Sequence, residues 1–272
     1  MKQRKNVILF LLITLFLLFA SPVQGTTFKI LLAGEGAGTS WADWNETTES
    51  GWGDSNTYIV VFDNPVAGGE EVGQGGGLGA TDLTLTQAGT VAGCTTTPPS
   101  RYLEQADDVF TGTTVFLNTF FGTDTTWTII QKVYLSTDPA AASTCFWFLN
   151  DSVDSDYLYV ERTVAGLLTI RVLPASGTDD IYSSTLTGPA VGNYVYVAAW
   201  SDGTDIRFGW SYTKPTKWSD FSANTGVSRT VAYTPQVDYN TRTIVGRAAN
   251  QTVAGYYRFL VLSKSCLIDN SK

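Results

Sequence analysis

Histidine is absent from the 272-residue sequence, and charged residues make up only 15% of it, against roughly 25% in an average globular protein. Without histidine the chain cannot form a Ser-His-Asp or Cys-His nucleophile system, nor a histidine-containing zinc site. The formal net charge of −8 argues against a nucleic-acid partner, because affinity for the phosphate backbone depends on an excess of Lys and Arg. These absences exclude several large classes of enzyme and binding protein.

The longest apolar run lies near the N-terminus. Three basic residues precede it, it extends over residues 7–20, and small residues follow up to Gly25. This pattern predicts a secretory signal peptide over residues 1–25, whereas a membrane anchor would need about 18 or more apolar residues. Cleavage after Gly25 would remove three of the 17 basic residues and leave a net charge of −11. We therefore expect a secreted, acidic protein with no membrane span in its mature form.

From residue 26 onward, runs rich in Val, Ile, Tyr, Phe, Trp and Thr alternate with clusters of Gly, Asn, Asp, Ser and Pro, which is typical of strands joined by turns. The expected strands are Phe28–Ala33, Tyr58–Asp63, Leu83–Gln87, Trp127–Leu135, Thr144–Leu149, Tyr157–Arg162, Leu167–Leu173, Tyr194–Trp200, Ile206–Tyr212, Arg242–Gly246 and Tyr256–Ser263. Hairpin turns are expected at Asp202-Gly203 and Ala165-Gly166. About a dozen strands without a helical period predict an all-β fold, a two-sheet antiparallel sandwich or jelly roll.

The mature chain has the size of one domain, because all-β sandwiches commonly contain 200–250 residues. We expect a single domain over residues 26–272, with N-terminal strands and a glycine-rich loop over 26–80 and the main sandwich over 81–272. The alternative is a flexible linker at residues 64–80, where glycines surround the acidic pair Glu70-Glu71. The segment before it has only two strand-like runs, too few to bury a core alone.

Carboxylates are densest at Asp151, Asp154 and Asp156, between two expected strands. Hard cations such as Ca²⁺ take several oxygen ligands from carboxylates and backbone carbonyls in such turns. The loop is therefore a candidate calcium site, although it lacks the central Gly and terminal Glu of an EF-hand. The alternative is a solvated turn, where Asp and Asn are favoured for their local bonds to the backbone.

Aromatic residues in polar surroundings are the remaining binding signal. Trp41, Trp44 and Trp52 lie in one polar segment, and Tyr212 and Trp218 bracket a Pro-containing loop. An exposed aromatic ring beside polar groups offers a sugar a flat apolar face together with hydrogen-bonding partners. We expect these residues to bind a glycan, with Trp218 ranked first because a Lys-Pro pair stiffens its loop. Alternatively, the tryptophans fold back as caps over the ends of the sandwich.

Three segments, residues 127–135, 194–204 and 256–262, together resemble the laminin G-like group of the concanavalin A-like lectin/glucanase superfamily. They match its early Trp-Thr-Ile strand, its Trp-Val-Tyr-Val-Ala strand that ends in an Asp-Gly hairpin, with Tyr194 here in place of the Trp, and its final aromatic strand. The resemblance covers residues 82–269 and implies a two-sheet jelly roll, often calcium-assisted, that binds carbohydrate or protein. The glucanase run Glu-x-Asp-x-(x)-Glu is absent, since the chain contains no Glu-x-Asp.

The three cysteines are Cys94, Cys145 and Cys266, and in an exported protein two of them are expected to pair. In the resembled group the first and last strands lie side by side. If residues 101–104 pair with the closing strand near Leu260, Cys94 comes toward Cys266, and Cys145 is left as a small buried residue. The resemblance thus implies a Cys94–Cys266 disulfide, while the sequence by itself leaves the pairing open.

These observations favour a secreted binding module with no assigned catalytic residue, which recognises a carbohydrate at a cell or particle surface. A neutral glycan is expected, because the net negative charge repels acidic polymers. A second hypothesis is a structural or adhesive surface protein that uses the sandwich as a scaffold. A third is a glycoside hydrolase with an unrecognised carboxylate pair.

Overall fold

The computed structural model describes part of the chain, and all described residues belong to one unit, residues 39–272. The described residues are 57–75, 84–89, 91–94, 100–104, 108–112, 124–150, 157–173, 182–221, 229–230, 242–246 and 251–270. The expected leader over residues 1–25 and the expected strand Phe28–Ala33 lie outside them. The signal peptide and the single domain therefore stay predictions.

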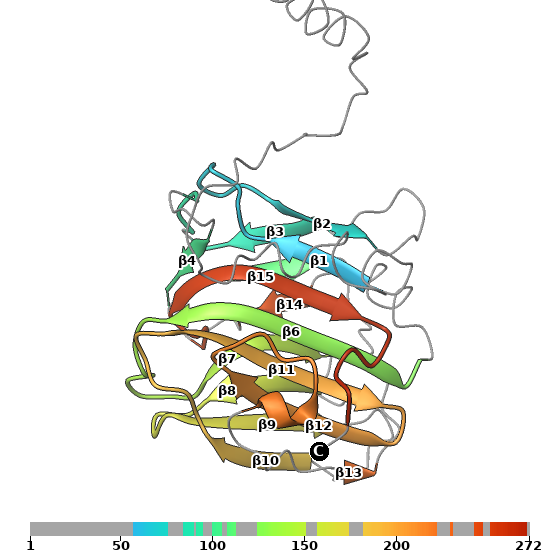
Figure 1. The fold of residues 1–272 in the computed structure, drawn as a ribbon. Coiled ribbons are helices and arrows are strands. Elements are labelled where there is room, and N and C mark those ends of the chain that lie inside the picture. Colours follow the sequence, from blue (N-terminus) through green and yellow to red (C-terminus); the bar gives the residue numbers. More distant parts are fainter. Residues whose placement is uncertain are drawn as a thin grey trace, which may run out of the picture. The chain divides into compact units, whose positions relative to one another are not determined.

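The larger of two antiparallel sheets contains 11 strands. They are β1 (Thr57–Val61), β2 (Glu71–Gly75), β3 (Thr84–Ala88), β4 (Arg101–Leu103), β5 (Val109–Gly112), β6 (Thr126–Leu135), β11 (Tyr194–Asp202), β12 (Asp205–Ser211), β13 (Arg229–Thr230), β14 (Arg242–Val245) and β15 (Gly255–Ser263). Their order is β13-β12-β11-β6-β15-β1-β2-β3-β5-β14, and β4 pairs with β15 outside this path. The first and last described strands, β1 and β15, therefore lie side by side (Figure 1).

The smaller sheet contains β7 (Thr144–Asn150), β8 (Tyr157–Arg162), β9 (Leu167–Leu173) and β10 (Tyr182–Thr187), in the order β10-β9-β8-β7. It lies behind β6, β11 and β12 in Figure 1. Beside β7 lies the end of β14, where the Gly246 N–H donates to the Phe146 carbonyl at 2.8 Å. The strands β14, β5 and β3 thus extend the layer of the smaller sheet, and the described strands form a two-layer sandwich.

The core lies between the two layers, because each strand turns alternate residues inward. On β12, Ile206, Phe208 and Trp210 join the core while Arg207 lies on the opposite face, as the alternation in the sequence predicted. Cys145 is fully buried, as expected. The predicted all-β fold, an antiparallel sandwich of two sheets, is confirmed.

A second apolar cluster covers part of the outer face of the larger sheet. It contains Ile59, Ile130, Tyr196, Ala198, Trp200, Trp218, Phe221, Phe259, Val261 and Ile268. The covering residues come from the 3₁₀-helix η2 (Trp218–Asp220) and from the chain after β15. These two segments also bond to each other, because the Trp218 N–H donates to the Asp269 carbonyl at 2.7 Å. The larger sheet is therefore buried on both faces here.

Each expected strand that falls on described residues is present, and both predicted hairpins are confirmed. Gly166 and Gly203 adopt φ of +73° and +91°, the left-handed region that glycine reaches without steric cost. Short or polar strands were missed, namely β2, β4, β5, β10 and β13. The described part of residues 64–80 contains β2 and is therefore more than a flexible linker.

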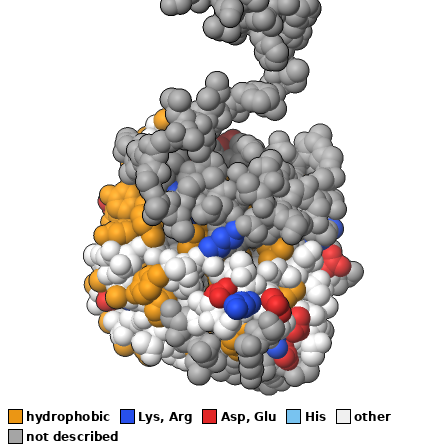
Figure 2. Space-filling view, viewed as in Figure 1, with side chains coloured by type: hydrophobic (Ala, Val, Ile, Leu, Met, Phe, Trp, Pro, Cys, Tyr) orange, Lys and Arg blue, Asp and Glu red, His pale blue; other side chains and the backbone are white. Residues whose placement is uncertain are grey.

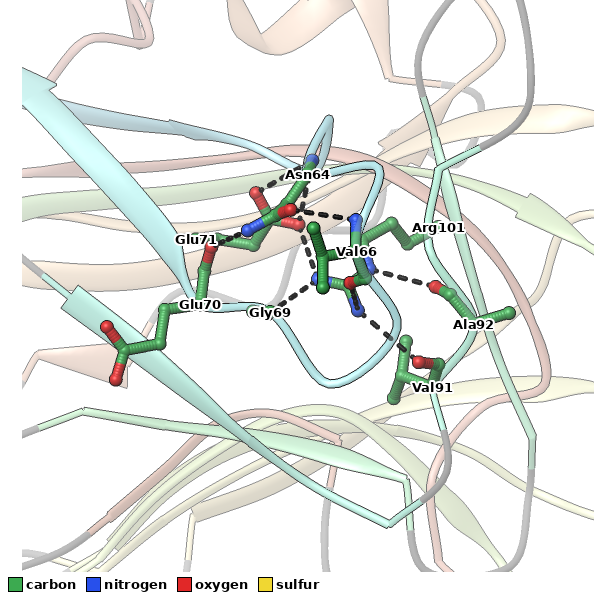
Figure 3. A network of polar contacts seen from close by, with 8 residues as sticks. All are labelled: Asn64, Val66, Gly69, Glu70, Glu71, Val91, Ala92 and Arg101. Atoms are coloured by element: carbon green, nitrogen blue, oxygen red, sulfur yellow. Dashed lines mark hydrogen bonds and ion pairs between the residues drawn. The ribbon is translucent and has the colours of Figure 1, made fainter.

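Glu71, the second residue of the acidic pair in that glycine-rich stretch, has a structural role (Figure 3). Glu71 is 2% exposed and its carboxylate accepts a hydrogen bond from Arg101, which is 1% exposed, at 2.8 Å. The same guanidinium donates to the carbonyls of Gly69 and Ala92, at 2.7 and 3.1 Å. One buried arginine thus donates hydrogen bonds to a carboxylate and to loop carbonyls that lack a partner in a neighbouring strand.

The predicted Cys94–Cys266 disulfide is wrong, because the three described cysteines form no disulfide. The Cys94 N–H donates to the Asn64 carbonyl, and the chain just before Asn64 bonds to the Arg258 carbonyl. Cys266 follows the other end of β15. From Arg258 to Ser263 alone the strand spans about 17 Å at about 3.4 Å per residue, whereas a disulfide needs Cα atoms about 4.4–6.8 Å apart. The strand β4 does pair with β15, but at Gly255–Tyr257 and not near Leu260.

Candidate functional site

Four tyrosines from four neighbouring strands form a row on the outer face of the larger sheet. Tyr256 of β15 lies opposite both Tyr102 of β4 and Tyr134 of β6, and Tyr134 lies opposite Tyr194 of β11. The ring centroids of Tyr102 and Tyr256, Tyr256 and Tyr134, and Tyr134 and Tyr194 are 4.9, 6.1 and 5.3 Å apart. All four side chains are half-buried. We call these four residues the tyrosine row.

The alternation of each strand explains why these rings point away from the core. On β6, Val133 and Leu135 are fully buried in the core, and Tyr134 between them faces outward. Neighbouring rings in cross-strand pairs also stabilise each other. Figure 2 shows hydrophobic side chains gathered at the left of this face, over the ends of β4 and β15.

Lys132 adds a positive charge next to the row. On β6 it comes two residues before Tyr134, so its side chain points to the same outer face, and it is only 3% exposed. Its Nζ donates to the Tyr196 hydroxyl at 2.8 Å and lies 4.5 Å from the centroid of that ring. The aromatic ring and the hydroxyl together compensate a buried ammonium group.

Arg258 adds a second positive charge, and a β-bulge positions it. The pairing of β15 with β6 shifts register between Tyr257 and Phe259, so Arg258 is the extra residue; such bulges redirect a side chain. Arg258 is 4% exposed, and its guanidinium carbon lies 5.4 Å from the centroid of Tyr194. Its buried Nε and Nη2 have no hydrogen-bond partner among the described residues. Burial lowers the pKa of Arg258 from its ordinary value.

The row and its two cations supply the groups that a binding site uses. The rings offer apolar faces, the hydroxyls donate and accept hydrogen bonds, and Lys132 and Arg258 provide positive charge. The sequence contains a signal for this site, because each of the three segments that resemble laminin G-like strands contains one of the residues Tyr134, Tyr194 and Tyr256. This signal predicts a common site only when the order of the strands in the sheet is known.

Trp218, ranked first as a sugar-binding ring, does not form an exposed platform, and that prediction is wrong. Its side chain is 8% exposed and packs edge-on against Trp200, with ring centroids 5.9 Å apart. The Arg207 guanidinium covers its ring at 4.7 Å. The helix η2 and the bond to Asp269 turn Trp218 onto the outer face of the sheet. The alternative that this tryptophan folds back is correct, but it covers a sheet face and not an end of the sandwich.

Tyr212, the other candidate in that loop, is exposed. Its side chain is 44% exposed, its ring contacts Trp210 edge-on at 5.0 Å, and its hydroxyl accepts the Ala190 N–H at 3.0 Å. With Trp218 buried, Tyr212 is left without the second ring that the prediction gave it. It stays a candidate binding residue.

The other predicted sites lie outside the described residues. They are the tryptophans Trp41, Trp44 and Trp52 and the calcium candidates Asp151, Asp154 and Asp156. In the part of the chain that the structure describes, no group of three or more His, Cys, Asp or Glu residues could hold a metal ion. Within the same part, no helix is long and apolar enough to cross a membrane.

The architecture belongs to the antiparallel β-sandwich class, and solved structures of that class match it. One is the botulinum neurotoxin serotype D binding domain, with a TM-score of 0.53 and 8% identity, covering 78% of this chain and 49% of that chain. A second is the binding domain of botulinum neurotoxin DC in complex with rat synaptotagmin II, with a TM-score of 0.54 and 6% identity, covering 77% and 48%. A third is that binding domain in complex with SialylT, with a TM-score of 0.52 and 9% identity, covering 78% and 48%.

At such low identity the likeness shows the fold alone. The chain spans about half the length of these binding domains (49% and 48%). No protein-family model matches the sequence, and a search of curated proteins also finds no match.

Proposed function

We propose that the protein is a non-enzymatic binding module that recognises a carbohydrate at a cell or particle surface through the tyrosine row. The observation that carries the proposal is the line of four half-buried rings at spacings of 4.9, 6.1 and 5.3 Å. The C–H faces of sugar rings pack on aromatic faces, and tyrosine hydroxyls bond to sugar hydroxyls. A row of rings on rigid strands provides these contacts with little loss of conformational entropy on binding.

The structural neighbours support a binding role in general. One of them is in complex with SialylT and another with rat synaptotagmin II, so sandwiches of this architecture occur within domains that bind glycan and protein partners. The laminin G-like assignment and export through the signal peptide stay part of the proposal. Both agree with a partner outside the cell.

A glycan array with the purified protein tests the proposal. Tyr256→Ala removes the ring that contacts both Tyr102 and Tyr134, and we expect it to weaken binding by about 1–2 kcal/mol, or roughly 5- to 30-fold. Tyr256→Phe keeps the ring and separates stacking from hydrogen bonding.

Tyr212→Ala tests the other candidate, because it removes an exposed tyrosine that pairs with Trp210 instead of the row. If the row is the site, this variant binds as the wild-type protein does. If Tyr212→Ala abolishes binding and Tyr256→Ala does not, the site lies at Tyr212 and not at the row.

The calcium site at Asp151, Asp154 and Asp156 is a second part of the proposal. An ion that binds the folded protein raises the melting temperature with its concentration. Equal melting curves in EDTA and in millimolar calcium would leave the three aspartates as a solvated turn.

A further inference from the structure

The five arginines whose side chains the structure describes fall into two groups according to their carboxylate contacts. Four of them each contact a carboxylate, in the pairs Arg101–Glu71, Arg162–Asp138, Arg171–Glu161 and Arg207–Asp202. Arg258 is 4% exposed and has no ion pair with any described residue. Arg162, Arg171 and Arg207 each have one buried nitrogen without a hydrogen-bond partner among the described residues, but Arg258 has two. A buried guanidinium nitrogen without an acceptor is costly for a fold and calls for an explanation such as a functional role.

The position of Arg258 indicates what its acceptor would be. The bulge at Tyr257/Phe259 turns it toward Tyr194, one end of the tyrosine row. Lys132 lies on the same face with its Nζ at Tyr196, so two cations accompany the row. A planar guanidinium binds a carboxylate through two parallel N–H···O bonds.

We propose that Arg258 binds the carboxylate of an acidic sugar whose neighbouring units stack on the tyrosine row. This inference rests on the proposed function and assigns the class of glycan: one acidic unit in an otherwise neutral chain. The net charge of −8 still disfavours polyanions. Two cations nevertheless lie beside the row, so this proposal departs from the neutral glycan expected from net charge alone.

The side chain of Tyr194 packs against the guanidinium. Its ring lies 5.4 Å from the guanidinium carbon and is itself half-buried, while Nε and Nη2 are buried beneath the surface. Binding of a carboxylate at these nitrogens therefore requires the Tyr194 side chain to change rotamer, and rotamer changes are common when ligands bind. The ligand carboxylate then supplies the acceptors that the protein lacks.

Titration calorimetry with 3′-sialyllactose and lactose tests the inference, because the two probes differ by one acidic sugar. The wild-type protein should bind 3′-sialyllactose at least tenfold more tightly. Arg258→Met should bind both probes equally. Arg258→Lys keeps the positive charge but loses the two parallel N–H donors, so it should retain only part of the preference for 3′-sialyllactose. Tyr256→Ala should weaken binding of both probes.

The outcomes separate the two proposals. Equal affinity of the wild-type protein for both probes, or an unchanged preference in a folded Arg258→Met or Arg258→Lys variant, overturns the acidic-sugar inference and leaves the carbohydrate site intact. No binding of either probe or of any glycan on the array overturns both. Tighter binding of a peptide with a free C-terminal carboxylate than of 3′-sialyllactose would show that the acceptor is not a sugar.

Discussion

Arg101 and Arg258 are both almost fully buried, yet their surroundings are opposite. The Arg101 guanidinium donates to the Glu71 carboxylate and to backbone carbonyls of two loops, and it lies 5.3 Å from the ring of Phe110. Arg258 contacts the Tyr194 ring and has two buried nitrogens without a partner among the described residues. Burial alone therefore does not tell the role of an arginine; the partners of its donors do.

The location of each arginine explains the difference. Arg101 lies on a three-residue strand beside irregular loops, whose carbonyls need donors that no strand supplies. Arg258 lies on a bulge of β15, where its own carbonyl already accepts the Phe62 N–H and its side chain is redirected. The first position requires a donor to hold the fold together, and the second leaves the donors available for a ligand.

The largest effect is expected at Arg101. Arg101→Met should lower the free energy of unfolding by about 3–5 kcal/mol, because it leaves Glu71 buried without its partner. Urea denaturation measures the change. Burial raises the pKa of Glu71 more than the contact with Arg101 lowers it, so the double variant with Glu71→Gln should recover much of the loss. A single variant within 1 kcal/mol of wild type would contradict a structural role for Arg101.

Trp218→Ala should lower the free energy of unfolding by about 3 kcal/mol, since it removes a buried ring between Trp200 and Arg207. The matched control is Tyr212→Ala at the exposed end of the same loop, which should change it by less than about 0.5 kcal/mol. Equal melting temperatures for the two variants would contradict the burial of Trp218 and support an exposed ring. Because both aromatic residues flank the same loop, the two variants test whether the burial of the ring determines its contribution to the free energy of unfolding.

A third prediction concerns acid stability at Asp202, whose carboxylate accepts hydrogen bonds from Arg207 and Asn270. Burial raises the pKa of Asp202, but hydrogen bonds from the Asp205 N–H, Arg207 and the Thr204 N–H outweigh it and hold the pKa below its usual 3.8. The folded state therefore favours the carboxylate, and this stabilisation is present above pH 3.8 and lost as the pH falls through the lower folded value.

Asp202→Asn removes the titrating group and serves as the comparison. The stability advantage of the wild-type protein over Asp202→Asn should shrink between pH 5 and pH 2, measured by urea denaturation at each pH. A difference that is constant over this range would show that Asp202 does not contribute through its charge.

The smallest effect on stability is expected at Arg258. Arg258→Met should change the free energy of unfolding by no more than about 1 kcal/mol, because the loss of packing is offset by removal of an unpaired buried cation. Urea denaturation of this variant beside Arg101→Met compares the two arginines directly. A loss above about 2 kcal/mol would place Arg258 with Arg101 as a structural residue.

The strands were predictable because their signals are local. The runs at Tyr157–Arg162 and Leu167–Leu173 coincide with β8 and β9, and a glycine of left-handed conformation joins them. The strand β2 was missed because its two glycines carry little β-propensity. The strand β10 was missed because its run of Ser and Thr shows no clear alternation of apolar and polar residues. The burial of Trp218 was missed because Asp269 and Trp200, which hold it in place, are distant in the sequence.

The sequence by itself determined the fold class, the hairpins and the inward face of each strand, since alternation and turn chemistry act over a few residues. Only the tertiary structure decided which outward residues meet. Tyr102, Tyr134, Tyr194 and Tyr256 come from distant parts of the chain and form one row because β4, β15, β6 and β11 pair in that order and register. Strand order and register follow from the packing of both sheets as a whole. The same packing determines which groups surround Arg101 and Arg258, and therefore their opposite roles.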